Sequence, residues 1–195
     1  MSILNFQKPD KILLQKATDF HGQFEFKPLE PGFGQTIGNS LRRILLSSLE
    51  GYAISAIRIA GVDHEFSSIP GVVEDVVDII LNIKQIRLKS AVKGDKATEH
   101  QIYITISGQD EFRAKDIESR TNMFKVMNPE LLICKMEPSV NLELEMTITK
   151  GRGYVPAEEN MPENAPIGVI PVDAIYTPLK KVSYLVSNTR VGQRT

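Results

Sequence analysis

Hydrophobic and polar residues alternate along several stretches of the chain. The clearest is NLELEMTITK, residues 141–150, in which Leu, Met or Ile occupies every second position. The same alternation recurs over residues 23–30, 57–59, 100–108 and 180–186. A period of two is typical of half-buried strands, and half-buried strands occur mostly in antiparallel sheets. The pattern therefore predicts a chain rich in antiparallel strands.

Two stretches instead show the period of a helix. In residues 71–84, GVVEDVVDIILNIK, apolar side chains fill one wide arc and polar side chains fill the other, so we expect this helix to lie on a sheet. Pro70 fits a helix start. Glu74, Asp75 and Asp78 form an acidic cluster on the polar arc, which we interpret as a solvated face, because sites for hard cations need converging oxygen ligands.

The second predicted helix lies in GFGQTIGNSLRRILLSS, residues 32–48. On a helical wheel its apolar residues form a stripe that includes Ile37, Leu41, Ile44 and Leu45. The opposite arc carries Arg42, Leu46 and Arg43. A leucine between two arginines on a rigid helix has the composition of an interface anchor, and it is also compatible with an ordinary solvated face.

The glycines at the start of this stretch resemble a phosphate-binding loop, but their spacing is not GxGxxG and no lysine is placed to reach a phosphate. We expect Gly32 and Gly34 to form a tight turn, with Thr36 capping the helix. Gly38, inside the helix, predicts close packing of another segment. We expect Gly151 and Gly153 to form a bend after a strand.

Polar stretches at residues 90–99, 127–130 and 156–168 predict loops. Residues 156–168 contain three prolines and form a long connection.

Composition limits the possible functions. The chain has 195 residues, with 23 Lys and Arg against 24 Asp and Glu, which argues against a fold that binds nucleic acid by itself. Cys134 is the only cysteine, so no intrachain disulfide can form, and its apolar surroundings predict a buried thiol. Lys8 and Asp10 argue against a signal peptide, and no apolar run approaches the ~20 residues of a membrane span. We therefore expect a cytoplasmic protein.

The sequence offers no catalytic constellation. Its three histidines, His21, His64 and His100, are scattered and lack the spacing of a zinc site. Neither GxSxG nor GxxxxGK[ST] occurs. We predict no catalytic residues, no metal and no cofactor. A small enzyme that uses the glycine turn for a phosphate ligand remains an alternative.

EPGFGQTIGNSLRRILLSS resembles the signature helix of the bacterial RNA polymerase α-subunit family. Further blocks match in order: residues 61–84, residues 151–157 (GRGYVPA), residues 167–184 and RVGQRT at residues 190–195. The resemblance covers essentially the whole chain and is weaker from about Ser90 to Lys135. It implies an α+β fold with two antiparallel-sheet-rich domains.

In that family a discontinuous dimerisation domain surrounds an inserted domain. Here the resemblance places the dimerisation domain at residues 1–51 plus 178–195 and the β-rich insert at residues 52–177. It implies a non-catalytic scaffold that forms a homodimer and recruits the large β and β′ subunits for transcription. The nucleotidyltransferase chemistry then belongs to those subunits.

The resemblance also assigns contact residues. Arg43 and Leu46 match the family's contact with β, and Lys84 and Val172 match its contact with β′. The dimer interface includes Ile37, Leu41, Ile44 and Leu45.

The family continues beyond VGQRT with a helix that packs across the dimer and with a C-terminal domain that binds DNA. We therefore expect no direct DNA binding from these residues and only a weak dimer. The alternative from another class is a homodimeric nucleic-acid-binding module that uses Arg42, Arg43 and Arg152.

Overall fold

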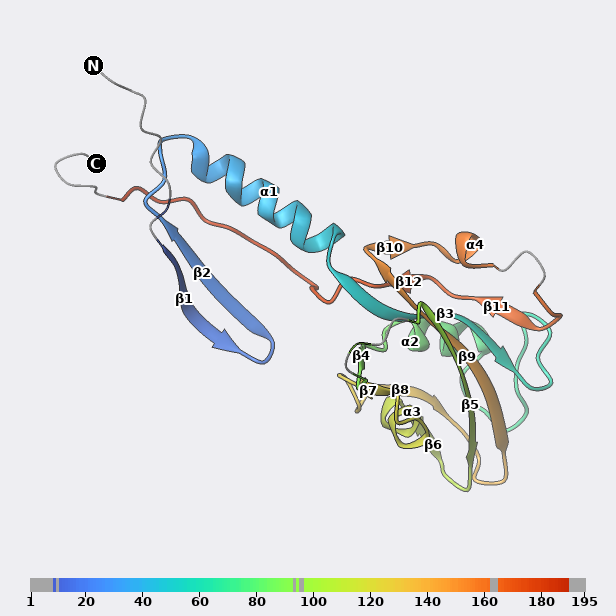
Figure 1. Cartoon of the computed structure of the whole chain (residues 1–195). Coiled ribbons are helices and arrows are strands. Elements are labelled where there is room, and N and C mark those ends of the chain that lie inside the picture. The colour runs from blue at the N-terminus through green and yellow to red at the C-terminus, as the bar shows by residue number, and fades with distance from the viewer. Residues whose placement is uncertain (1–8, 10, 93, 95–96, 162–164, 190–195) are drawn as a thin grey trace, which may run out of the picture. The chain divides into compact units, whose positions relative to one another are not determined.

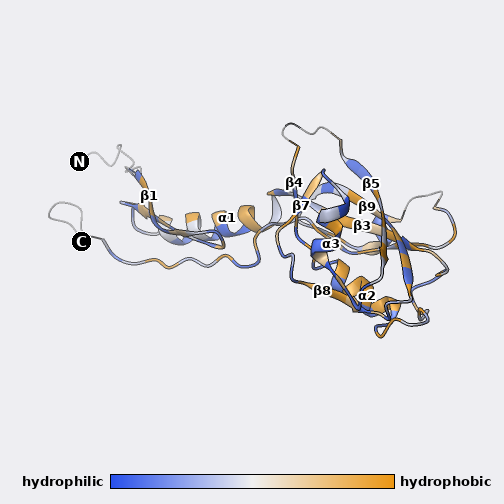
Figure 2. Cartoon of the chain, turned by 90° about the horizontal axis from the view of Figure 1, so that it is seen from below, coloured by the Kyte–Doolittle hydropathy of each residue, from blue (hydrophilic) through white to orange (hydrophobic). Residues whose placement is uncertain are grey.

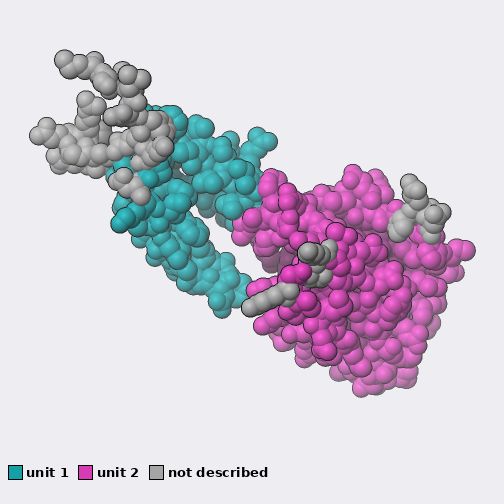
Figure 3. Space-filling model, in the orientation of Figure 1, with its two compact units in different colours: residues 1–45, 181–195 teal, residues 46–180 magenta. Residues whose placement is uncertain are grey.

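The computed structural model describes residues 9, 11–92, 94, 97–161 and 165–189 (Figure 1). Lys8 and Asp10, which argued against a signal peptide, lie outside the described residues, and so does RVGQRT, the last block of the resemblance. The chain divides into two compact units, unit 1 with residues 1–45 and 181–195, and unit 2 with residues 46–180 (Figure 3). Residues 46–51 and 178–180, which the resemblance places in the dimerisation domain, belong to unit 2.

Unit 1 contains a hairpin and most of a helix. Strands β1, Lys11–Thr18, and β2, His21–Lys27, pair antiparallel, and helix α1 spans Phe33–Ser47. The predicted strand over residues 180–186 is wrong, because the described residues 181–189 belong to no strand. They form an extended segment that runs alongside α1 (Figure 1).

Helix α1 begins three residues earlier than the predicted cap. The Phe33 N–H donates to the Glu30 carbonyl oxygen at 3.1 Å, and Gly32 has a left-handed φ of 88° that turns the chain into the helix. Gly34 and Thr36 therefore lie within the helix, and the prediction that Thr36 caps it is wrong.

Unit 2 is built on a six-stranded antiparallel sheet. Its order is β5-β9-β3-β4-β7, and β11 also pairs with β3. The long strand β3 is central, with β9 on one side and β4 and β11 on the other, at different ends. The sheet's strands are β3 (Glu50–Ile59), β4 (Leu88–Ser90), β5 (Glu99–Ser107), β7 (Phe124–Val126), β9 (Asn141–Arg152) and β11 (Val169–Pro171).

Among its described residues, two small sheets and three helices complete this unit. Strand β6, Glu111–Arg113, pairs with β8, Leu132–Lys135, and β10, Tyr154–Val155, pairs with β12, Ala174–Ile175. The helices are α2 (Val76–Ile83), α3 (Ala114–Arg120) and α4 (Ala157–Asn160). The α+β class with antiparallel sheets, predicted from the sequence, is confirmed. The short α4 interrupts the loop predicted over residues 156–168.

The core of unit 2 lies on one face of the large sheet. The apolar side chains of β5 and β9 point into it, and α2 covers it with Val76, Ile79 and Ile83, which are fully buried. On the opposite face a small cluster contains Ala53, Ala174 and Tyr176. The alternation along β5 and β9 thus separates core from surface as the sequence predicted.

Helix α2 is shorter than the predicted helix because residues 71–74 are engaged elsewhere. Val72 forms an isolated antiparallel bridge with Met136, and the Val73 N–H donates to the Lys135 carbonyl oxygen at 2.9 Å. The Glu74 carboxylate accepts a hydrogen bond from the Lys135 N–H at 2.6 Å. Val73, predicted on the apolar arc, is consequently 76% exposed.

Two glycines near Tyr176 show how closely the second face is packed. A Cβ on Gly51 would lie 1.9 Å from the Tyr176 carbonyl oxygen, and a Cβ on Gly151 would meet the Tyr176 ring at 2.7 Å. Gly151 lies within β9 and makes no bend, whereas Gly153, with a φ of 65°, turns the chain from β9 into β10. The bend predicted at both glycines is therefore formed by Gly153.

Candidate functional site

Helix α1 carries an apolar stripe that the chain covers only in part. None of the helix's residues is buried. Ile37, Leu41 and Leu45 are partly buried, and Ile44 is 54% exposed. The structure thus brings the four residues of the predicted dimer interface onto one side of one helix, as their spacing requires.

The extended segment of residues 181–189 covers one border of this stripe. A Cβ on Gly38 would lie 2.5 Å from Cδ2 of Tyr184, and a Cβ on Gly34 would lie 2.7 Å from Cγ1 of Val186. The Tyr184 hydroxyl donates to Oε1 of Gln35 at 3.1 Å. The close packing predicted at Gly38 is therefore confirmed. The glycines admit this segment because they carry no side chain.

The hairpin of unit 1 also carries hydrophobic residues (Figure 2). Ile12 pairs with Phe26 and Leu14 pairs with Phe24, and residues paired in this way have side chains on the same face of the hairpin. Ile12, Leu14 and Phe24 are 62%, 58% and 59% exposed. Among its described residues, unit 1 contains no buried side chain. The apolar side chains of unit 1 are thus accessible for contact with another protein.

Arg43 and Leu46 lie three residues apart on α1 and are therefore neighbours on its surface. The Arg43 side chain is exposed, and Leu46 is partly buried. The structure thus brings together the two residues that the family resemblance assigns to the β contact. Arg42 is also exposed.

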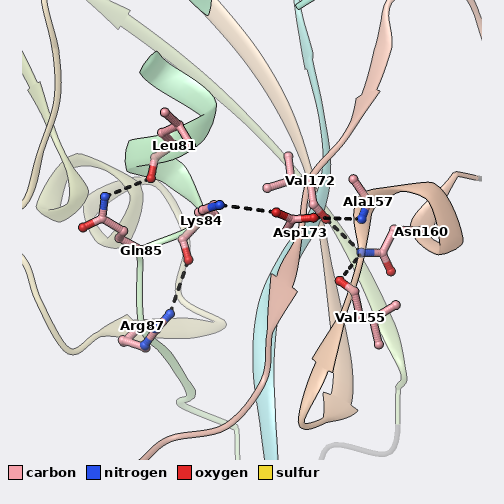
Figure 4. A network of polar contacts seen from close by, with 9 residues as sticks. All are labelled: Leu81, Lys84, Gln85, Arg87, Val155, Ala157, Asn160, Val172 and Asp173. Carbon is pink, nitrogen blue, oxygen red and sulfur yellow. Dashed lines mark hydrogen bonds and ion pairs between the residues drawn. The ribbon is translucent and has the colours of Figure 1, made fainter. Parts of the chain in front are cut away.

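Lys84 and Val172 meet in a polar network of unit 2 (Figure 4). The Lys84 ammonium lies 3.3 Å from Oδ2 of Asp173, the residue that follows Val172. Val172 itself is completely buried, and its carbonyl oxygen accepts a hydrogen bond from Nδ2 of Asn160 at 2.8 Å. Of these two predicted contact residues, only Lys84 has a side chain at the surface.

Several donors stabilise the charged form of Asp173. The Ala157 N–H, at the start of α4, donates to Oδ1 at 3.0 Å and lowers the pKa of the Asp173 carboxyl. The hydrogen bond from the Lys84 ammonium and the nearby Tyr154 hydroxyl lower this pKa further. Partial desolvation raises the pKa of the Tyr154 phenol, and the Asp173 carboxylate raises it further. Asp173 is therefore an anion that several donors share.

Arg152, part of the alternative nucleic-acid surface, is engaged within the chain. Its guanidinium lies 2.7 Å from Oε1 of Glu50, and the Lys150 ammonium lies 2.8 Å from Oε2 of the same residue. These contacts lower the pKa of Glu50 to about 2. The hydrogen bond from Arg152 has the largest effect, and the hydrogen bond from Lys150 has the second largest. This ion pairing opposes the use of Arg152 for phosphate contacts, so the structure adds nothing in favour of the nucleic-acid module.

Cys134 is fully buried, as predicted, and burial raises the pKa of its thiol to about 12. A thiol in this state is a poor nucleophile at neutral pH. Within the described residues, no group of three or more His, Cys, Asp or Glu side chains is arranged to hold a metal ion. In the same part of the chain, no helix is long and apolar enough to cross a membrane.

Sequence reasoning missed Asp173, Asn160 and Glu50. Their partners are distant along the chain, since Asp173 bonds Lys84 across 89 positions and Glu50 bonds Arg152 across 102. No periodic pattern marks such contacts. The alternation of β9 and the helical period of α2 indicated each element separately but not which side chains would meet between them.

Comparison with known proteins identifies the family. Residues 57–177 match the model of the RNA polymerase Rpb3/RpoA insert domain, and they lie within unit 2. The chain belongs to the RNA polymerase α-subunit family. The resemblance seen in the sequence is thereby confirmed.

Curated members of the α-subunit family align along the whole chain. The protein from Cytophaga hutchinsonii is 58% identical over 195 residues, that from Flavobacterium psychrophilum is 56% identical over 195, and that from Salinibacter ruber is 45% identical over 194. Each is named DNA-directed RNA polymerase subunit alpha. Each alignment includes all of this chain, which spans 58% of the length of these relatives.

Proposed function

We propose that this chain is a non-catalytic assembly scaffold of RNA polymerase, which pairs with a second copy of itself and then recruits the β and β′ subunits. The observation that carries the proposal is the uncovered apolar surface of unit 1. Ile44 on α1 and the hairpin face with Ile12, Leu14 and Phe24 are all more than half exposed. Extended apolar surfaces of this kind mark sites of protein association.

A second copy of the chain is a suitable occupant for the α1 stripe. A stripe of apolar side chains along one helix can meet its own copy across a two-fold axis, because such an interface uses the same patch twice. Unit 2, in contrast, has an extensive buried core of its own and needs no partner to form one. Dimerisation is therefore assigned to unit 1.

The two large subunits are assigned to separate surfaces. Arg43 and Leu46 form a pair on α1 that combines an exposed guanidinium with a partly buried leucine, which suits an interface anchor for β. Lys84 lies on unit 2 beside Asp173 and is assigned to β′. Membership of the α-subunit family supports the assignment of these two surfaces to β and β′.

Co-expression with the β and β′ subunits of the same polymerase tests the proposal. An affinity tag on this chain should recover two copies of the chain, then β, and β′ only when β is present. Light scattering would give the stoichiometry of each complex. Recovery of neither large subunit under conditions in which a full-length relative recovers both would contradict the scaffold function.

A further inference from the structure

The carboxylate of Asp173 bonds two other segments of unit 2, α2 and α4 (Figure 4). One oxygen contacts the Lys84 ammonium at the C-terminal end of α2, at 3.3 Å. The other accepts the Ala157 N–H at the start of α4, at 3.0 Å. The Tyr154 hydroxyl of β10 lies near enough to this carboxylate to lower its pKa. A single side chain thus contacts both the end of α2 and the start of α4.

The backbone that carries Asp173 is itself held in place. The preceding Val172 is fully buried, and its N–H donates to the Ser55 carbonyl oxygen on β3 at 2.8 Å. The Asn160 amide donates to the Val172 carbonyl oxygen at 2.8 Å and reaches the Val155 carbonyl oxygen at 3.5 Å. The central sheet and α4 therefore determine the position of the Asp173 carboxylate.

The ion pair lies at the surface beside two accessible apolar side chains. The side chains of Lys84 and Asp173 are 27% and 28% exposed. Leu81 precedes Lys84 by one helical turn and is 44% exposed, and Tyr154 is 58% exposed. Together, Leu81, Lys84, Tyr154 and Asp173 form a composite surface, in which a tyrosine and a leucine flank a partly shielded charge pair. Interface centres are enriched in aromatic residues.

We propose that Asp173 is a positioning residue for the contact at Lys84: it holds the ammonium beside Leu81 and Tyr154, in one composite surface on which β′ docks. The inference rests on the proposed function and deepens it. A lysine restrained before binding loses less side-chain entropy when its partner arrives. Val172, which has no accessible side chain, acts through the position of Asp173 and does not touch the partner.

Capture of β′ by the complex of this chain with β tests the inference. In Asp173→Asn the amide oxygen can still accept the Ala157 N–H, so the substitution removes the charge and leaves the bond to α4. Lys84→Met removes the ammonium and keeps the length of the side chain. Lys84→Arg retains the charge. Lys89→Met is the matched control, because Lys89 is an exposed lysine of the same unit on β4.

We expect Asp173→Asn and Lys84→Met each to weaken capture of β′ about tenfold, with an unchanged melting temperature and unchanged capture of β. The double variant should lose no more than either single variant, because both act through one pair. Lys84→Arg and the control should bind β′ normally. Multiplication of the two effects in the double variant, or full affinity in Asp173→Asn, would overturn the inference and leave the scaffold function standing. Failure of the unmodified chain to capture either subunit would overturn both.

Discussion

The ring of Tyr184 lies directly against the backbone of Gly38. A Cβ at Gly38 would come within 2.5 to 2.9 Å of three ring atoms, which is closer than such contacts allow. The tyrosine hydroxyl reaches onward to Gln35 and donates to its side-chain oxygen at 3.1 Å. The glycine in the middle of α1 therefore provides the place where the segment of residues 181–189 packs on the helix.

We expect Gly38→Ala to release this segment. Alanine is favoured in a helix by about 1 kcal/mol over glycine, but its methyl group must displace the Tyr184 ring. Limited trypsin cleavage after Lys180 and Lys181 should be faster in the variant. In a Tyr184→Ala background the same substitution should no longer speed cleavage, because nothing remains to be displaced. Equal acceleration in both backgrounds would show that the ring contact is not the cause.

The cluster of Glu50, Lys150 and Arg152 predicts an acid-sensitive part of the stability of unit 2. The pKa of Glu50 lies at about 2 in the folded chain, against an ordinary value of 4.5. Between these values the unfolded chain binds a proton that the folded chain does not. The stabilisation from Glu50 is therefore complete above about pH 4.5, declines as the pH falls, and is lost below about pH 2.

Comparison of wild type with Glu50→Gln isolates this contribution. The difference between their free energies of unfolding should be constant above about pH 4.5 and should shrink toward pH 2. Glu99→Gln is a matched control, because Glu99 makes no ion pair with another described residue. If the difference in free energy of unfolding between wild type and Glu50→Gln did not change with pH, the prediction would be contradicted.

The fold was predictable wherever one face of an element is buried by the chain itself. Strands β5 and β9 alternate because one side of each faces the core, and the sequence records that difference. The alternation over residues 180–186 was misleading for a physical reason. Tyr184 and Val186 do face one surface, but that surface is helix α1 and not a neighbouring strand. A sequence indicates that an extended segment has two unlike sides and does not indicate what covers them.

The start of α2 was missed for a related reason. Residues 72 and 73 are apolar at helical spacing, yet they form no helical turn. The Val73 N–H donates to the Lys135 carbonyl oxygen, and Val72 forms an isolated antiparallel bridge with Met136. Tertiary pairing thus overrides local preference. The candidate site divides in the same way: the helical wheel could place Arg43 beside Leu46, but only the fold brings Asp173 to Lys84.

We expect Arg43→Ala and Leu46→Ala to weaken the capture of β by about 2 kcal/mol each, roughly thirtyfold in Kd. Arg43 is exposed, so its loss should leave the stability of the chain nearly unchanged. Leu46 is partly buried, and its truncation should reduce stability slightly. Titration of β into each variant, followed by fluorescence anisotropy, measures the affinity.

Arg42→Ala is the matched control for Arg43→Ala, because it removes the same charge from the neighbouring position of α1. Thermal unfolding of each variant separates a binding defect from a folding defect. If Arg42→Ala weakened the capture of β as much as Arg43→Ala, the contact would depend on overall charge and not on the pair formed by Arg43 and Leu46.

The exposed Ile44 gives the most direct test of dimerisation. Its side chain is 54% exposed in the single chain, and a second copy meeting the α1 stripe would cover it on both protomers. Burial of the exposed half of an isoleucine is favourable by about 1 kcal/mol, so the two symmetric contacts contribute about 2 kcal/mol, roughly thirtyfold in the Kd of the dimer.

Ile44→Lys should remove this contribution and also place two like charges opposite each other. Sedimentation across a dilution series should therefore show the variant as a monomer at concentrations where wild type is dimeric. Asn39→Lys introduces the same charge on the opposite side of α1 and should leave the dimer intact. If both lysine variants dissociated equally, general charge repulsion would explain the loss and the α1 stripe would not be the interface.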